Sequence, residues 1–130
     1  MRAATLVVAL VLLPGLAGCR SGEPLKVTSL QLGRSLNPDR TVATHTTRFK
    51  PDDTIYVSVL TTGFGSASIT ARWKYAGRVI GEPTKEVSYK GDAATEFHIQ
   101  NSGGFPAGDY AVEIVVNGQP IGTRDFRVEK

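Results

Sequence analysis

Residues 67–75 read ASITARWKY, and their character alternates at every position. Small, aliphatic and aromatic side chains occupy the odd-numbered positions, whereas serine, threonine, arginine and lysine occupy the even-numbered ones. Because successive side chains of a strand point to opposite faces, one face of this segment is apolar and the other is polar. The segment therefore predicts a half-buried strand whose Trp73 points into the core as its central element.

The same alternation returns in four further segments, which are TIYVSVLT at 54–61, TEFHIQ at 95–100, DYAVEIVVN at 109–117 and DFRVE at 125–129. Turn-forming combinations of Gly, Pro, Asn and Asp separate the segments. Outside the N-terminus, no stretch of useful length has the periodicity of a helix. We therefore expect an all-β domain over residues 25–130, with about eight short strands in a two-sheet antiparallel β-sandwich.

Two details of this pattern resemble the immunoglobulin-like (Ig-like) and fibronectin type III-like modules of bacteria. Trp73 lies on the second central strand, where such folds often bury a tryptophan. PAGDYAVEIVVNG at 106–118 resembles their penultimate strand, with its Gly-x-Tyr opening and alternating aliphatic residues. The resemblance implies a single Ig-like sandwich of ~100 residues, without the disulfide of antibody domains, and it implies no particular activity.

Residues 1–18 have the layout of a secretory signal. Arg2 supplies a positive charge, residues 3–13 carry no charge, and Pro14-Gly15 interrupts the apolar run before a short tail of small residues. The run is too short for a transmembrane helix, which needs ~20 apolar residues. The layout predicts a signal peptide that is cleaved from the mature protein.

The chain's single cysteine, Cys19, follows this segment directly, and Leu16-Ala17-Gly18-Cys19 resembles the lipobox of bacterial lipoproteins at all four positions. The resemblance implies that the Cys19 thiol takes a diacylglyceryl group and that the signal peptide is cut just before it. It also implies that the new amino group is acylated, as by palmitate. Cys19 is then a lipid anchor, because two or three acyl chains hold a protein durably on a membrane. The alternative is a buried or free cysteine in an uncleaved apolar segment.

Residues 19–24 are expected to tether the domain to lipid. They are mostly polar and contain Gly and Pro, and at ~3.3 to 3.6 Å per extended residue they keep the domain within about 20 Å of the headgroups. In Gram-negative lipoproteins, which this pattern resembles, an Asp after the lipidated cysteine retains the protein in the inner membrane, whereas this chain has Arg20. We therefore expect attachment in the cell envelope, at the outer membrane and facing the periplasm.

The charged residues do not indicate a polyanionic partner. The chain has 15 Lys and Arg against 12 Asp and Glu, and the two signs are interspersed along the sequence. No basic stripe or acidic tail is present, so a nucleic-acid partner is not expected.

Candidate reactive residues are few, and each has a structural explanation. His45 and His98 lie far apart among Thr or Glu neighbours, which favours solvated surface residues over metal ligands. Asp52-Asp53 could form a carboxylate pair, but its place after Pro51 and before a strand favours a turn cap. The sequence has no motif of a catalytic, phosphate-binding or metal site. We therefore expect no cofactor, no metal and no enzyme activity.

Two glycine-rich segments, TTGFGS at 61–66 and NSGGFPAG at 101–108, leave two interpretations open. They are either recognition loops that present Phe64 and Phe105, or turns whose phenylalanines fold onto the sandwich edge. The favoured function is a membrane-anchored envelope lipoprotein with a non-catalytic interaction or structural domain, whose partner is an envelope protein or a cell-wall component. The alternative is a small enzyme or enzyme inhibitor that uses the loops of the sandwich.

Strand parity also predicts a group of charges on the outer face of one sheet. Its members are Arg72, Lys74, Glu113 and Arg127. With Glu113 between basic residues, the group is expected to be structural rather than ligand-binding.

Ile121 and Phe126 are both apolar but have opposite parity. Strict alternation cannot bury both side chains. The sequence therefore predicts a bulge or bend near Gly122, or else an exposed Ile121.

Overall fold

The computed structural model describes residues 23–130. In this part of the chain the strands are β1 (Lys26–Gly33), β2 (Arg48–Phe49), β3 (Ile55–Thr62), β4 (Phe64–Tyr75), β5 (Arg78–Gly81), β6 (Thr84–Lys90), β7 (Ala93–Ile99), β8 (Gly108–Val116) and β9 (Gln119–Val128). The predicted signal peptide, the anchor at Cys19 and most of the predicted tether lie outside the described residues. Residues 23–130 contain no helix that is long and apolar enough to cross a membrane.

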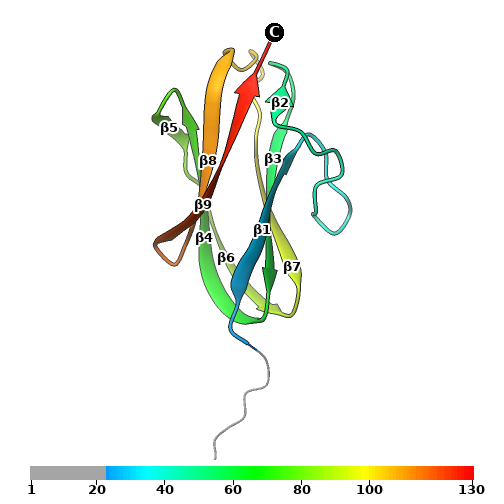
Figure 1. Cartoon of the computed structure of the whole chain (residues 1–130), viewed down its shortest axis with the longest axis vertical. Coiled ribbons are helices and arrows are strands. Elements are labelled where there is room, and N and C mark those ends of the chain that lie inside the picture. The colour runs from blue at the N-terminus through cyan, green and yellow to red at the C-terminus, as the bar shows by residue number, and fades with distance from the viewer. Residues whose placement is uncertain (1–22) are drawn as a thin grey trace, which may run out of the picture.

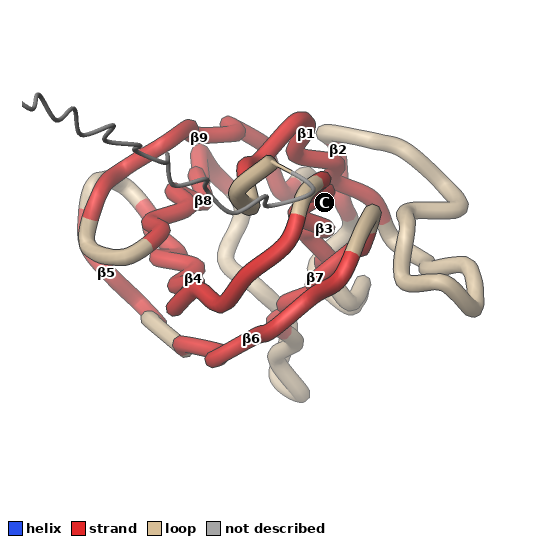
Figure 2. The backbone as a smooth tube through the Cα atoms, turned by 90° about the horizontal axis from the view of Figure 1, so that it is seen from below, coloured by secondary structure: helices blue, strands red, loops and turns tan. Residues whose placement is uncertain are grey.

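The strands form two sheets that pack face to face (Figure 1). The smaller sheet has the antiparallel order β1-β3-β7. The larger sheet has the order β2-β9-β8-β4-β5, and β6 continues beyond β5 along the same edge of β4. Figure 2 shows the strands of both sheets arranged around a common interior. The expected all-β fold with two sheets is confirmed.

The sandwich has two ends. At the near end, the described chain begins at Glu23, and tight turns at Gly63, Gly91 and Gly118 join successive strands. At the far end, β9 finishes at Val128 and a longer segment connects β7 to β8. Figure 1 shows the far end at the top, beside the marked C-terminus.

The far half of the core is built from aromatic rings. The ring of Phe126 packs edge-on against Phe49 at a centroid distance of 5.4 Å and against Trp73 at 6.1 Å. It also stacks on Tyr110 at 5.4 Å. The near half is instead filled by smaller side chains, among them Leu30, Val59, Ala67, Ile69 and Ile114.

Trp73 is fully buried, so the expectation that it points into the core is confirmed. Its indole Nε1 is buried and has no hydrogen-bond partner among the described residues. An unpaired buried donor costs about 1 to 3 kcal/mol. Packing of the ring, rather than a polar contact, therefore holds Trp73 in place.

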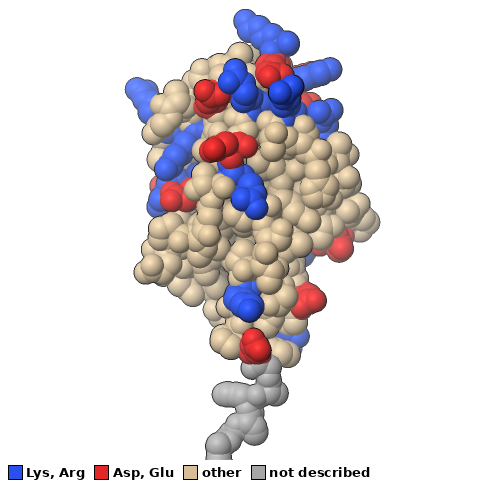
Figure 3. All heavy atoms as spheres, in the orientation of Figure 1, with Lys and Arg blue, Asp and Glu red and all other residues tan. Residues whose placement is uncertain are grey.

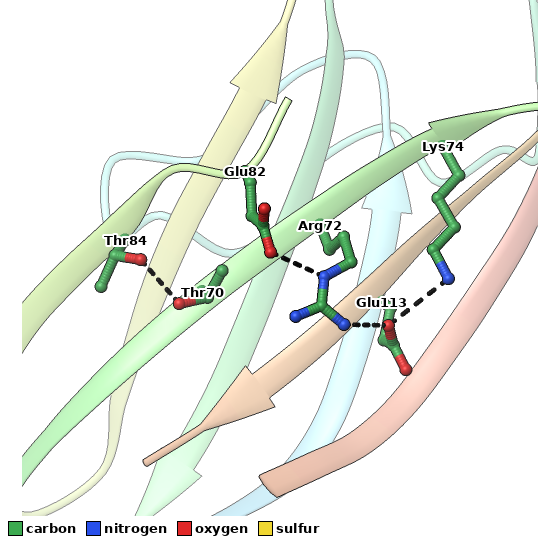
Figure 4. Close-up of polar contacts among 6 residues, drawn as sticks. All are labelled: Thr70, Arg72, Lys74, Glu82, Thr84 and Glu113. Atoms are coloured by element: carbon green, nitrogen blue, oxygen red, sulfur yellow. Dashed lines mark hydrogen bonds and ion pairs between the residues drawn. The ribbon is translucent and has the colours of Figure 1, made fainter. Parts of the chain in front are cut away.

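On the outer face of the larger sheet, Glu113 lies between two basic side chains of β4 (Figure 4). Its carboxylate accepts a hydrogen bond from Arg72 Nη1 at 2.8 Å and lies 3.5 Å from Lys74 Nζ. The hydrogen bond from Arg72, helped by the charge of Lys74, lowers the pKa of the Glu113 carboxyl. Glu82 extends the row, with its carboxylate 2.7 Å from Arg72 Nε. The predicted outward orientation of Glu113 is confirmed.

Arg127 does not join this row. It pairs with Asp109 at 2.7 Å near the far end, and β9 places Thr123 opposite Glu113. Its predicted position on the outer face is confirmed, but its ion pair lies apart from the one that Glu113 forms. Parity predicts the face of the sheet on which a residue lies, but the register between strands decides which residues of the neighbouring strand lie beside it.

β9 departs from regular pairing at Ile121. Ile114 of β8 pairs with Gly122 while Val115 pairs with Pro120, so Ile121 is the extra residue of a bulge. Ile121 is 41% exposed, so both of the predicted alternatives occur together. A Cβ at Gly122 would lie 3.0 Å from Leu30 Cδ1, and this close approach of β1 and β9 favours glycine there.

The outer face of the smaller sheet differs from its sequence pattern. Ser58 alternates with Val57 and Val59, yet it is fully buried. The loop at 34–47 covers it, and Ser58 Oγ donates a hydrogen bond to the Arg40 carbonyl oxygen at 2.7 Å. Polar residues on this face are therefore not all solvent-exposed.

Candidate binding groove

The phenylalanines of the two glycine-rich segments lie at opposite ends of the molecule. Phe64 begins β4 at the near end and is 48% exposed. Phe105 lies in the β7–β8 connection at the far end, where it is buried against Tyr110 at a centroid distance of 6.1 Å. β4 runs from Phe64 to Tyr75, a length of about 36 Å at ~3.3 Å per residue. The two rings therefore cannot form one recognition surface.

An open groove of about 470 Å³ lies at the far end of the sandwich. We call it the far-end groove, and its lining residues are Tyr75, Ile80, Ile99, Gln100, Asn101, Ser102, Phe105, Pro106 and Tyr110. Concave sites with an apolar lining and a few polar groups are the usual form of a ligand site. The far-end groove is therefore the candidate functional site.

A turn in the β7–β8 connection directs Phe105 into the base of this groove. Asn101 Oδ1 accepts a hydrogen bond from the Gly103 amide at 3.0 Å, and the Asn101 carbonyl accepts one from the Gly104 amide at 2.9 Å. Gly104 has a φ of 89°, which favours glycine, and the Phe105 amide then donates to the Pro51 carbonyl at 2.8 Å. The ring of Phe105 turns inward, while Asn101 stays exposed at the rim.

Tyr75 and Tyr110 form one wall of the groove, and their ring centroids lie 4.5 Å apart. The Tyr110 hydroxyl donates to the Pro106 carbonyl at 2.6 Å, and the Tyr75 hydroxyl donates to the Ala107 carbonyl at 3.1 Å. Burial raises the pKa of Tyr110, and the neighbouring Tyr75 adds to the shift. Tyr110 therefore remains a protonated donor at neutral pH.

Gly108 allows the β7–β8 connection to pass close to Tyr75. Its φ is 143°, and a Cβ at this position would lie 3.1 Å from Tyr75 Cε1. Residues other than glycine are strained at such a φ. The glycine is therefore part of what positions the tyrosine wall.

The lining determines which contacts the groove offers. Its rings and isoleucines suit an apolar or planar group, and Gln100, Asn101 and Ser102 offer neutral hydrogen bonds. Among the described residues that line it, none is charged. On the face shown in Figure 3, charges of both signs intermingle, most of them toward the far end. The groove suits binding by stacking and neutral hydrogen bonds.

The two histidines lie in one row across the smaller sheet. His45 bridges Gly33 of β1, and Gly33 pairs with Tyr56 of β3. Tyr56 in turn pairs with His98 of β7. Three interstrand spacings of ~4.8 Å separate the histidines by about 14 Å, which is too far for one metal ion. In residues 23–130, no group of three His, Cys, Asp or Glu side chains could hold a metal ion.

The acidic pair belongs to the turn that precedes β3. Asp53 Oδ2 accepts a hydrogen bond from the Lys50 amide at 2.8 Å, and the Asp53 amide donates to the Lys50 carbonyl at 3.0 Å. Asp52 is exposed to solvent. The interpretation as a turn cap is confirmed for Asp53.

No protein-family model matches the chain, and no curated protein sequence matches it. Among solved structures, the β-glucosidase of Listeria innocua in complex with glucose superposes on 85% of this chain, with a TM-score of 0.54 and 12% sequence identity. The same enzyme in complex with isofagomine superposes on 83%, with a TM-score of 0.52 and 12% identity. This chain spans only 16% of the enzyme's length. At this identity, the likeness shows the fold alone.

A third solved structure is the alkylpurine DNA glycosylase of Pseudomonas fluorescens bound to DNA. It matches over 82% of this chain and 30% of its own, with a TM-score of 0.49 and 14% identity.

Sequence reasoning singled out one part of the far-end groove, the segment at 101–108, but not the groove as a whole. Alternation assigns Tyr75 and Tyr110 to inner faces, but their contact depends on the register that pairs them directly across β4 and β8. One local signal is present in Gly108-Asp109-Tyr110. The glycine, two residues before the tyrosine, lets the ring of Tyr75 approach the backbone closely.

Proposed function

We propose that this chain is an envelope lipoprotein, anchored through acylated Cys19, whose non-catalytic domain binds a partner in the far-end groove. The signal layout and the complete lipobox support the anchor, and Arg20 favours the outer membrane, facing the periplasm. The observation that carries the binding role is the position of the groove, because it lies at the end opposite to Glu23. A short tether at the near end would hold that end beside the lipid and present the groove to the periplasm.

We further propose that the domain is Ig-like or fibronectin type III-like. The hydroxyl of Tyr110, near the start of β8, bonds back to the carbonyl of Pro106, which is the arrangement of a tyrosine corner. Trp73 is buried on β4, which corresponds to the tryptophan-bearing strand of these domains. In the constant-type Ig order, the fourth strand belongs to the sheet formed by the first two strands. The strand at the equivalent place in this chain is β6, and it pairs with β4 in the larger sheet instead. The larger sheet of this chain is extended accordingly.

The groove also restricts the class of partner. Its neutral lining favours an envelope protein or cell-wall component that offers an apolar or planar group surrounded by hydrogen-bonding groups. A strongly charged ligand would lose hydration without gaining an ion pair there.

Incorporation of labelled palmitate tests the anchor. The full-length chain, produced in a Gram-negative bacterium, is expected to take up the label, and Cys19→Ser is expected to take up none. Cys19 is the chain's single cysteine, so no other thiol can replace it. Equal labelling of the two proteins, or an unlabelled wild type, would overturn the anchor.

Chemical cross-linking in detergent-solubilised envelopes tests the groove. Ile80 is 49% exposed and lines the groove, so Ile80→Ser should lose the cross-linked partner without a change in the midpoint of denaturant unfolding. Phe64→Ser is the matched control, because Phe64 is 48% exposed but lies at the near end. Equal cross-linking of both variants, or no specific partner of the wild type, contradicts the role of the groove.

A further inference from the structure

A second groove, of about 370 Å³, lies at the near end beside β1 and β9. We call it the near-end groove, and its apolar lining residues are Leu25, Val27, Ile69, Val116 and Ile121. The edges of the two sheets meet at Leu30, whose carbonyl accepts a hydrogen bond from Arg124 Nε at 3.2 Å. On the near-end side of this contact, Leu25, Val27 and Val116 are only partly buried and form the border between the core and the groove.

Two large apolar side chains are exposed on this side of the molecule, one at the tip of the near end and one on the groove about halfway along β4, opposite Thr70. Phe64 is 48% exposed at the start of β4, and Ile121 is 41% exposed in the bulge of β9. Exposed bulky apolar residues beside an apolar groove are typical of an interaction surface. Their partner is indicated by where the chain enters the domain.

The segment that leads back to Cys19 leaves the domain beside Phe64. The Phe64 amide donates to the Glu23 carbonyl at 2.9 Å, and the Leu25 amide donates to the Phe64 carbonyl at 3.0 Å. From Cys19 to Leu25 the extended chain reaches at most about 20 Å. A lipid anchor at Cys19 therefore confines Phe64 and the near-end groove to the vicinity of the membrane surface.

We propose that the near end docks directly on the lipid surface, tilted toward the edge of β1 and β9, so that both Phe64 and Ile121 reach the headgroups. This inference rests on the proposed function, because it requires the anchor at Cys19. The anchor makes the second contact intramolecular, so a weak apolar interaction is enough to hold the domain in one orientation. That orientation directs the far-end groove away from the membrane.

The charges around this end are balanced. Lys26 lines the near-end groove and Lys90 pairs with Phe64 across β6 and β4, while Glu23 and Asp92 lie in the adjacent chain segments. Both signs are thus present at the proposed contact. Docking should depend on apolar insertion, and we expect it on zwitterionic vesicles, with little dependence on salt.

Quenching by brominated lipids tests this docking. All strands of the described residues lie within 26–128, so a chain that begins at Cys19 retains the sandwich. Its thiol can be coupled to a maleimide lipid in phosphatidylcholine vesicles. Phe64→Trp places a reporter at the near end, and Ile80→Trp places a matched reporter of similar exposure at the far end. Buried Trp73 gives the same background in both. Brominated lipids should quench only the reporter introduced by Phe64→Trp, and equal quenching of the two would overturn the proposal.

A second substitution tests the contribution of Ile121. In the Phe64→Trp protein, Ile121→Ser should lower the ratio of docked to undocked domain about three- to sevenfold. This factor corresponds to the transfer free energy expected for a partly exposed isoleucine. Val79→Ser is the control, because Val79 is 51% exposed on β5 at the far end. An unchanged ratio in Ile121→Ser contradicts insertion of this edge.

The synthetic anchor separates the two proposals. A wild type without palmitate label, or equal labelling of wild type and Cys19→Ser, would overturn Cys19 as the biological anchor, whatever the vesicles show. Equal quenching of the two reporters would overturn docking, even when Cys19 is lipidated in cells.

Discussion

The two halves of the core are bordered differently: a hydrogen-bonded connection covers the far half, whereas partly buried aliphatic side chains and a groove border the near half. At the far end, Tyr75 and Tyr110 donate their hydroxyls to carbonyls of the segment that covers them. At the near end, Leu25, Val27 and Val116 are only partly buried along the near-end groove. The comparison teaches that a strand pattern decides which face is buried, while the connections decide whether the end of a core is closed.

The chemistry of the side chains explains the difference. A tyrosine combines an apolar ring with a hydroxyl that can satisfy a loop carbonyl, so it can join a core to the polar backbone above it. Aliphatic side chains have no such group. The tight turns at Gly63, Gly91 and Gly118 leave little chain to cover them.

The largest effect should come from the buried indole of the far half. Trp73→Ala should lower the free energy of unfolding by about 3 to 5 kcal/mol, measured by denaturant titration, because it empties a fully buried site. Phe64→Ala, at the exposed tip of the near end, should change it by less than about 0.5 kcal/mol. Trp73→Phe should cost much less than Trp73→Ala, since it keeps a ring and removes the unpaired Nε1. A midpoint unchanged in Trp73→Ala would show that the far half is not what stabilises the domain.

The next effect compares one glycine from each end. Gly108→Ala should destabilise the domain by about 1 to 3 kcal/mol, because the positive φ strains the backbone and the new Cβ meets the Tyr75 ring. Gly118→Ala also has a positive φ, of 83°, but nothing lies within 4 Å of its Cβ, so its effect should be smaller. Thermal or denaturant unfolding measures both variants. Equal losses would mean that backbone strain alone explains Gly108 and that the ring contact contributes nothing.

Tyr110→Phe should remove about 0.5 to 1.5 kcal/mol of stability, because it deletes the hydrogen bond to the Pro106 carbonyl. The pKa of Tyr110 is raised in the folded state. Its contribution is therefore present below the unfolded pKa of about 10 and is lost as the pH rises through the higher folded value. Unfolding measured between neutral and strongly alkaline pH should show a steeper loss for the wild type than for Tyr110→Phe. Parallel curves would place the alkaline sensitivity elsewhere.

The smallest effect should come from the charged row on the outer face, which belongs to neither half of the core. Glu113→Gln should cost less than about 1 kcal/mol, because the pair with Arg72 is partly exposed and screened. The pKa of Glu113 is lowered in the folded state. Its contribution is therefore present above the unfolded pKa of about 4.3 and is lost as the pH falls through the lower folded value. The stability difference between wild type and variant should shrink below pH ~4, and a constant difference would contradict this assignment.

Strand parity predicted much of the core from the sequence. It placed Trp73, Val112 and Phe126 on inner faces, and all three are buried in the larger sheet. The parity conflict between Ile121 and Phe126 predicted the bulge. These predictions succeed because the side on which a residue lies is a local property of an extended chain.

Properties that depend on distant segments were not predicted. Ser58 has the parity of a surface residue but is covered by a loop, and Arg127 has the expected face but lies beside Asp109 instead of Glu113. The far-end groove combines the end of β4, the start of β8 and the turn before Phe105. Its existence depends on register and on backbone hydrogen bonds, which alternation does not specify.

The described chain enters and leaves the sandwich at opposite ends, since β1 begins at the near end and β9 finishes at the far end (Figure 1). A pulling force between these two points runs along the strands. The ladders that join β1 to β3 and β9 to β8 are then loaded in shear, so their hydrogen bonds must break together instead of one at a time. The short parallel pairing of β2 with β9 reinforces the last strand where such a load would be applied. The domain should therefore behave as a stiff mechanical link that ruptures abruptly under single-molecule extension.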